Sequence, residues 1–125
     1  MSLDDRRTCG IALYAEQFGL SVVEVESYFV ETYGKEFAEE AFQATGGAAW
    51  ENNHLDLRVR SLLVLASLAT LGGVESRIRN HTKWALRHGA TVEEIRSVIT
   101  LVANYAGFAR ASVAMEAVNA ALAEA

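Results

Sequence analysis

The complete absence of proline is the feature that most constrains how this sequence of 125 residues can fold. Proline is the strongest helix breaker, because its ring removes a backbone donor and collides with the preceding turn. Without it, every segment is open to helix formation, and glycine remains as the main signal for a helix end. Apolar residues make up 51% of the sequence and charged residues 22%, as in folded globular proteins. We therefore predict an all-α protein.

The beginning of the sequence predicts two helices. Residues 3–18 have acidic side chains near their start, where a helix favours negative charge, and Gly19 follows as a C-cap. Ser21 and Glu24 then have the spacing of a capping box, in which each side chain accepts a hydrogen bond from the other residue's backbone. Apolar residues recur at helical intervals after Ser21 until Gly34, where we expect this second helix to be interrupted.

Two further helices are expected on either side of a loop. Residues 35–45 place Phe37, Ala38, Ala41 and Phe42 on one side of a helix. The segment that follows, to residue 54, has the polar turn residues of a loop. Asp56 can then cap a helix that ends at Gly72 and Gly73. Its predicted apolar stripe, widened by Leu65 and Leu68, consists of Val59, Leu62, Leu63, Ala66 and Ala69.

The remaining sequence completes a set of about six helices. Residues 77–89 form one segment that Gly89 ends. Thr91 and Glu94 form another capping box, and it opens a helix whose stripe is Ile95, Val98, Ile99 and Val102. The last helix is expected over residues 109–122, with Val113, Ala117 and Ala120 packed on neighbours. No linker divides the chain, so we predict a single domain over residues 1–125.

Charge and cysteine content exclude several classes of function. The net charge is −5, and no cluster of lysine and arginine forms the stripe that nucleic acid binding requires. Cys9 is the only cysteine, so an intrachain disulfide, a thiolate metal cage and a CxxC redox pair are all excluded. No set of histidine and carboxylate residues has metal-ligand spacing, so neither a metal nor another cofactor is expected.

The cellular setting follows from similar arguments. The N-terminal residues are charged and lack the apolar core of an export signal. The most apolar run, residues 61–73, is shorter than the roughly 20 residues that span a bilayer. We therefore expect a cytoplasmic protein with no membrane partner. Helices that are apolar nearly all round also favour a homo-oligomer, because a chain of this size has little interior in which to bury them.

The segment "RIRNHTKWALRHG", residues 77–89, contains the main candidates for a functional site. If it is helical, Arg77, His81, Trp84 and His88 share one flank, because they are three or four residues apart in succession. That flank is either the wall of an active site or an ordinary amphipathic face that carries imidazoles. His88 lies next to Gly89 at the helix end, where a capping role is expected instead of catalysis.

An ordered set of features between Leu55 and Gly107 resembles the carboxymuconolactone decarboxylase family, within the alkylhydroperoxidase D-like superfamily. The sequence opens with LD-x-R-x-R at residues 55–60 and continues with an apolar helix that ends in glycine. His81 then precedes an "AL-x-x-G-x-T-x-E-E-I" segment, and a Tyr-x-Gly follows at Tyr105. A weaker likeness extends to Trp50, which lies ahead of the LD pair.

The resemblance implies an all-α fold assembled into homo-trimers or homo-hexamers, with active sites near subunit contacts. It also implies one of two chemistries. Superfamily peroxidases carry Cys-x-x-Cys shortly before the histidine, whereas here Val74 and Arg77 occupy those positions. The other chemistry is the cofactor-free decarboxylation of a small carboxylated lactone, such as 4-carboxymuconolactone, to an enol-lactone in aromatic-acid degradation. A small carboxylic acid is therefore the expected substrate.

The resemblance also implies roles for particular residues. His81 matches the family's histidine and could supply a proton, since the ordinary pKa of histidine is near neutrality. Arg77, one turn earlier, could bind a substrate carboxylate through two hydrogen bonds. Tyr105 and Trp50 are the other expected substrate-binding residues. The predicted pocket is lined by Trp50, Leu62, Leu65, Arg77, His81, Leu101 and Tyr105.

Two positions depart from the family pattern. Members commonly have histidine four residues before the tyrosine, where this sequence has Leu101, and often have proline at the position of Ala109. These departures leave two alternatives to a decarboxylase. One is a peroxidase-like redox protein, which the cysteine count opposes. The other is a ligand-binding or assembly module that has kept the fold without the chemistry.

Overall fold

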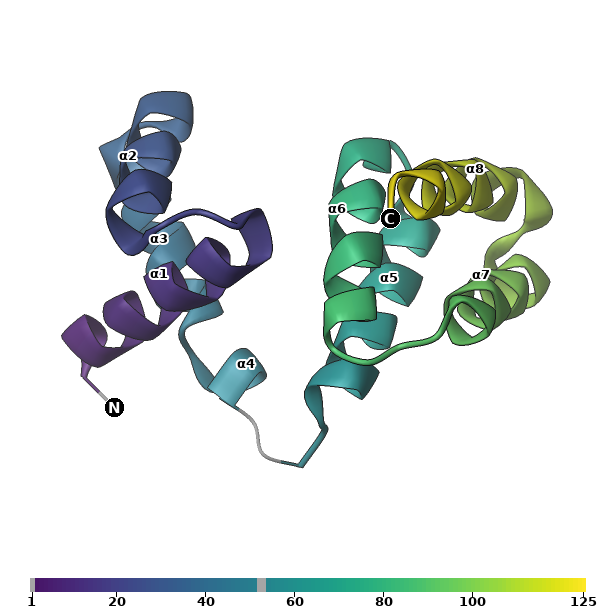
Figure 1. Ribbon diagram of the computed structural model, residues 1–125, viewed down its shortest axis with the longest axis horizontal. Coiled ribbons are helices and arrows are strands. Elements are labelled where there is room, and N and C mark those ends of the chain that lie inside the picture. Colours follow the sequence, from purple (N-terminus) through teal and green to yellow (C-terminus); the bar gives the residue numbers. More distant parts are fainter. Residues whose placement is uncertain (1, 52–53) are drawn as a thin grey trace. The chain divides into compact units, whose positions relative to one another are not determined.

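A computed structural model describes residues 2–51 and 54–125, and within these ranges every regular element is a helix (Figure 1). The all-α prediction is therefore confirmed. These two ranges contain eight helices, where about six were expected: α1 (Leu3–Phe18), α2 (Val22–Tyr33), α3 (Lys35–Thr45), α4 (Ala48–Glu51), α5 (Leu57–Leu71), α6 (Glu75–Arg87), α7 (Val92–Ala106) and α8 (Phe108–Glu124). No helix in the described part of the chain is both long and apolar enough to cross a bilayer.

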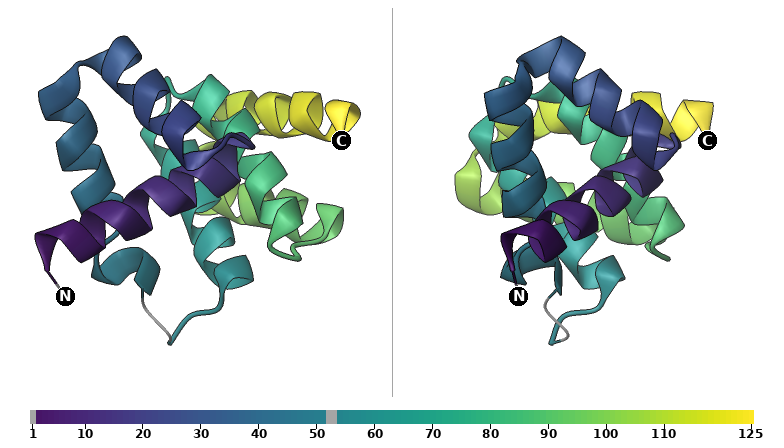
Figure 2. Two further views of the ribbon diagram at one scale, coloured as in Figure 1. Left: turned by 60° about the vertical axis from the view of Figure 1, so that its left-hand side comes forward. Right: turned by 90° about the vertical axis from the view of Figure 1, so that its left-hand side faces the viewer.

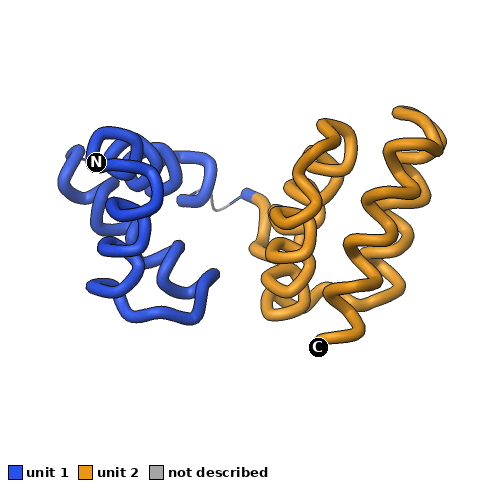
Figure 3. Tube along the Cα trace, turned by 90° about the horizontal axis from the view of Figure 1, so that it is seen from above, with its two compact units in different colours: residues 1–54 blue, residues 55–125 orange. Residues whose placement is uncertain are grey.

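The chain is organised in two compact units, residues 1–54 and 55–125 (Figure 3). The first contains α1 to α4 and the second contains α5 to α8. Each unit has its own cluster of buried apolar side chains, so each is described by itself. The single domain over residues 1–125 stays a prediction.

Local sequence signals place most helix ends where they were expected. Ser21 and Thr91 accept hydrogen bonds from the backbone N–H groups of Glu24 and Glu94, and both capping boxes are complete. The Asp56 side chain caps α5 in the same way. One prediction was wrong, because the expected loop around Trp50 contains α4, a single helical turn.

The first unit is built on the packing of α1 against α3, with α2 contacting both (Figure 2). Its buried core is Ile11, Ala15, Val25, Phe29, Ala38 and Phe42. Phe37 was expected on the same side as Phe42 but is largely exposed, and its ring lies against Tyr33. The Arg7 guanidinium pairs with the Glu39 carboxylate at 2.8 Å and with the Glu26 carboxylate, and so links all three helices.

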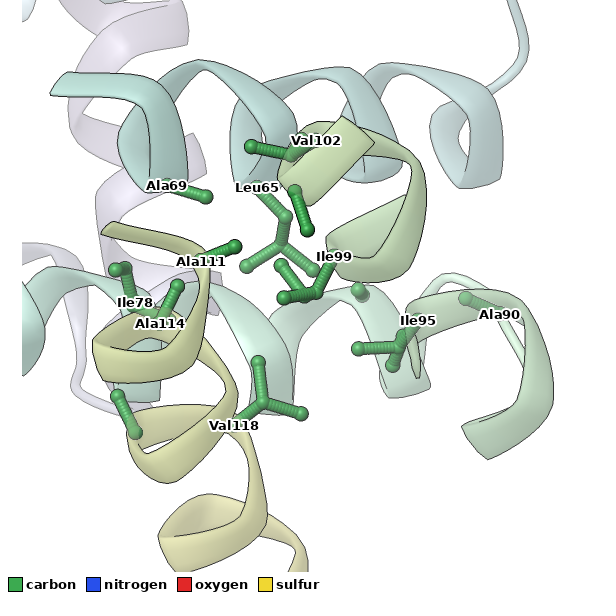
Figure 4. Packing of buried hydrophobic residues seen from close by; sticks show 13 residues of the cluster. Leu65, Ala69, Ile78, Ala90, Ile95, Ile99, Val102, Ala111, Ala114 and Val118 are labelled. Carbon is green, nitrogen blue, oxygen red and sulfur yellow. The ribbon is translucent and has the colours of Figure 1, made fainter. Parts of the chain in front are cut away.

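The second unit encloses the larger core, in which side chains from all four helices meet (Figure 4). Leu65 is fully buried at its centre, and the α7 stripe that includes Ile95 and Ile99 packs inward as predicted. In α8 the predicted packing is partly wrong. Ala117 is buried, but Val113 and Ala120 face outward. The buried face of that helix is Ala111, Ala114, Ala117, Val118 and Ala121.

The face that α5 buries also differs from the prediction. Ser61, Leu65 and Ala69 are buried, whereas Leu63 is 51% exposed. The helix is apolar nearly all round, so its sequence pattern does not specify one inward face. Packing against α6, α7 and α8 makes that choice.

Candidate functional site

The flank of α6 that carries the histidines is the candidate site. The sequence 75–87 forms one uninterrupted helix, so residues spaced by three and four positions line up along it. The His81 and Trp84 rings are 5.6 Å apart between centroids, and the Trp84 and His88 rings are 4.7 Å apart. Arg77 lies one turn before His81 and acts on its ring through space. The expected shared flank is therefore present.

His81 is half-buried, and this burial determines its protonation. Loss of water around the ring, followed by the positive charge of Arg77, lowers the pKa of His81 to about 4. The ring is therefore neutral at neutral pH. The ordinary pKa of histidine, near neutrality, therefore does not apply to His81 in the folded protein, because the tertiary environment lowers it.

Arg77 differs from His81 in being exposed, and its guanidinium donates a hydrogen bond to Ser76 Oγ at 3.2 Å. An exposed guanidinium next to a half-buried imidazole gives this flank one fixed positive charge and one neutral, titratable ring. Such a pair can bind a small anion, since arginine recognises carboxylates through two parallel N–H groups. The binding of a carboxylate here stays a prediction.

His88 has two roles at the end of α6. Its backbone N–H group donates to the Trp84 and Ala85 carbonyls, so the residue is the C-cap, as expected from its place beside Gly89. Its side chain, however, shares a hydrogen bond with Ser61 Oγ of α5, where the distance to Nδ1 is 2.7 Å. Sequence reasoning missed Ser61. A serine that opens the apolar run of α5 was the available signal.

The other predicted site residues are placed differently. Tyr105 is 86% exposed near the end of α7, and Leu101 lines a groove of about 400 Å³ with Ser97, Thr100, Asn104 and Phe108. Leu65 is enclosed in the core and Leu62 packs against it, so neither faces that groove.

Trp50, another predicted site residue, belongs to α4 of the first unit. The structure thus brings His81 and Arg77 together, and the roles of Tyr105 and Trp50 stay predictions.

Metal and thiol chemistry have little support among the described residues. No group of three or more histidine, cysteine or carboxylate residues in ranges 2–51 and 54–125 could hold a metal ion. The Cys9 thiol is partly buried, and this burial, followed by the nearby Glu51 carboxylate, raises its pKa. A thiol with a raised pKa is a poor nucleophile at neutral pH.

Comparison with known proteins shows to which family the chain belongs. The model of the carboxymuconolactone decarboxylase family matches residues 36–120, from α3 to α8. The chain belongs to the carboxymuconolactone decarboxylase family. The match includes parts of both units, so the carboxymuconolactone decarboxylase pattern is not confined to the helices that carry His81. The family assignment confirms the resemblance seen in the sequence.

One curated protein that is similar to this chain is an uncharacterized protein of Methanocaldococcus jannaschii. The two are 41% identical over 64 residues, which cover 51% of this chain and 59% of the relative. The chain therefore spans less than two thirds of that relative's length. The relative adds no substrate or activity.

Proposed function

We propose that the protein is a cofactor-free carboxy-lyase that acts on a small carboxylated lactone such as 4-carboxymuconolactone. The observation that carries the proposal is the pairing of the half-buried, neutral His81 with the exposed Arg77 on one flank of α6. This pair combines a charged group that can orient a carboxylate with a ring that can hold a proton. The family assignment supports the same reaction class.

The reaction breaks the bond between a ring carbon and its carboxylate. Carbon dioxide leaves, the electron pair moves into the conjugated lactone as a dienolate, and one proton is delivered to carbon. The protein must therefore orient the departing carboxylate, stabilise the dienolate and supply the proton. We assign the first two tasks to the Arg77 guanidinium and the third to the His81 imidazole.

A neutral His81 must first acquire a proton to act as the acid. A bound anionic substrate would favour this protonation. Its negative charge offsets the positive charge of Arg77 and stabilises the charged imidazolium. The imidazolium then gives its proton to the dienolate carbon and returns to the neutral state. The pKa of His81 is thus expected to be higher in the substrate complex than in the free protein.

The test is to follow 4-carboxymuconolactone by ultraviolet absorbance, beside a panel of other small lactone and keto acids. We expect turnover of at least one member. We expect His81→Ala to lower kcat by about a hundredfold or more, as for loss of a general acid, while helix content is kept. Turnover by His81→Ala at the rate of the unaltered protein would remove the proposed acid.

The two arginines of α6 provide a matched comparison. Arg77→Gln should raise KM by about tenfold, because it removes a charged partner of the carboxylate, and should also lower kcat, because it removes the charge that stabilises the dienolate. Arg79→Gln should leave both KM and kcat unchanged. Equal effects of the two substitutions would show that α6 attracts the substrate only through its overall positive charge.

The second candidate is a non-catalytic ligand-binding or assembly module, and Leu101 in place of the family's histidine is the observation that favours it. In that case no acid in the panel turns over, although a ligand can still shift the nuclear magnetic resonance signals of His81. A peroxidase is opposed by the single cysteine with its raised pKa. Consumption of a hydroperoxide with a dithiol as reductant would overturn that exclusion.

A further inference from the structure

Ser61 is one of two polar residues buried in the described part of the chain, and the two are satisfied differently. Thr82 Oγ1 donates to the Ile78 carbonyl at 2.7 Å, within its own helix. Ser61 Oγ instead bonds to His88 Nδ1 across two helices, also at 2.7 Å. A buried hydroxyl needs a partner, since an unpaired one has lost its hydrogen bonds to water without replacement. The bond therefore fixes where the His88 ring lies.

The His88 ring is the last of three aromatic rings that follow one another along α6, each in contact with the next. It lies 4.7 Å from the Trp84 ring, which is 2% exposed and lies 5.6 Å from the His81 ring. His88 is also the residue at which the helix ends, so the continuing helix no longer restrains its backbone. The bond to Ser61 is a restraint that α5 adds at this point.

We propose that Ser61 is a positioning residue for His81 and acts through His88 and Trp84. By holding the His88 ring against Trp84, it keeps the indole packed beside His81 and excludes water from that side of the imidazole. The part that concerns catalysis rests on the proposed function, because it requires His81 to be the proton donor. The packing itself does not depend on the reaction.

The consequence for His81 follows from what surrounds its ring. Burial is the main cause of its low pKa, and Arg77 is the charged group in the described ranges that adds to this effect. If the His88 ring is released, water reaches Trp84 and His81, and the charged form of His81 becomes less costly. Loss of the Ser61 hydroxyl should therefore raise the pKa of His81 through the two intervening rings.

The experiment is a proton resonance titration of the resting protein without substrate. The sequence has three histidines, so each ring signal can be assigned by substituting one residue at a time. We expect Ser61→Ala to raise the pKa of His81 by about half a unit or more. The control is Ser67→Ala on the same helix, whose exposed hydroxyl donates to the Leu63 carbonyl, and it should leave the pKa unchanged. A folded Ser61→Ala protein with an unchanged His81 pKa would overturn the proposal.

A double-mutant comparison identifies the route. His88→Ala removes the ring through which Ser61 acts, so adding Ser61→Ala to it should change the His81 pKa no further. The nuclear Overhauser contact between the Trp84 and His88 rings should also weaken in Ser61→Ala alone. Independent, additive shifts would contradict the proposed route. If Ser61→Ala fails to fold, His88→Ala still tests the route, because His88 is only half-buried and the substitution removes the same ring from Trp84.

The same variants separate this inference from the proposed function. If the protein turns over no acid but the titration gives the expected shifts, the decarboxylase proposal fails and the positioning role stands. If turnover depends on His81 but Ser61→Ala moves neither the His81 pKa nor kcat, the positioning role fails and the decarboxylase proposal stands.

Discussion

At the scale of single residues, the fold changes the acid–base behaviour of His81. Its pKa of about 4 lies below the ordinary value of 6.5, so the unfolded chain binds a proton more readily than the folded protein between these two pH values. Folding stability should therefore fall as the pH is lowered from about 6.5 to about 4. Above this range the folded and unfolded chains both hold a neutral His81 ring, so they no longer differ in the number of protons bound.

The size of this effect can be measured by urea unfolding across the pH range. The shift corresponds to about 3 kcal/mol at most, and partial exposure of the ring reduces it. In His81→Asn the loss of stability between pH 6.5 and 4 should be much smaller, whereas Ser67→Ala should keep the slope of the unaltered protein. An unchanged slope in His81→Asn would show that His81 is not the group responsible.

Carboxylates act in a lower part of the pH range. Hydrogen bonds from the Arg7 guanidinium lower the pKa of Glu39 below its ordinary value of 4.5. Its contribution to stability is present above that ordinary value and is lost as the pH falls through the lowered one. In an acid titration, the loss contributed by Glu39 should therefore come at lower pH than the loss contributed by His81.

At the scale of elements, a glycine determines how closely two helices approach. Gly10 lies where α1 crosses α3, and a Cβ atom added there would lie 1.8 Å from the Phe42 carbonyl oxygen. Alanine normally favours a helix by about 1 kcal/mol over glycine. Here the collision involves a backbone atom that cannot move without separating the helices, so the steric cost outweighs the gain.

We therefore expect Gly10→Ala to destabilise the first unit by about 2 kcal/mol or more, within the range found for overpacked cores. Thr8→Ala is the control, because Thr8 is exposed on the same helix. Chemical denaturation followed by circular dichroism measures both. A Gly10→Ala protein as stable as the unaltered one would mean that α1 and α3 do not pack this closely.

At the scale of the whole molecule, an exposed apolar surface of the second unit suggests assembly. Leu101, Tyr105 and Phe108 are 62–86% exposed at the end of α7 and the start of α8. Large exposed apolar side chains that gather on one surface are typical of protein contacts. We propose that copies of this chain associate there, as a homo-trimer or homo-hexamer.

Light scattering after size exclusion tests the assembly. We expect a mass three or six times that of one chain, and we expect Phe108→Asp to shift it to the monomer because the introduced carboxylate would be buried without a partner. Val23→Asp, on an exposed apolar residue of α2, should leave the mass unchanged. A monomeric unaltered protein would remove the proposal, and His81 would then have to act within one chain.

Much of the helical framework could be predicted from residues that are close in sequence. The Ser21 and Thr91 capping boxes depend on side chains three residues apart, and the α7 stripe depends on one helical period. The alignment of Arg77, His81, Trp84 and His88 is likewise a property of a single helix. These features need no knowledge of the neighbours, which is why the sequence by itself determined them.

Only the tertiary structure decided which faces are buried and what burial does. α5 is apolar on nearly every side, and packing with three other helices selected Leu65 for the core and left Leu63 outside. The bond between Ser61 and His88 joins residues 27 positions apart. The low pKa of His81 arises chiefly from the loss of surrounding water. Each depends on atoms brought together by folding, and no local pattern encodes such proximity.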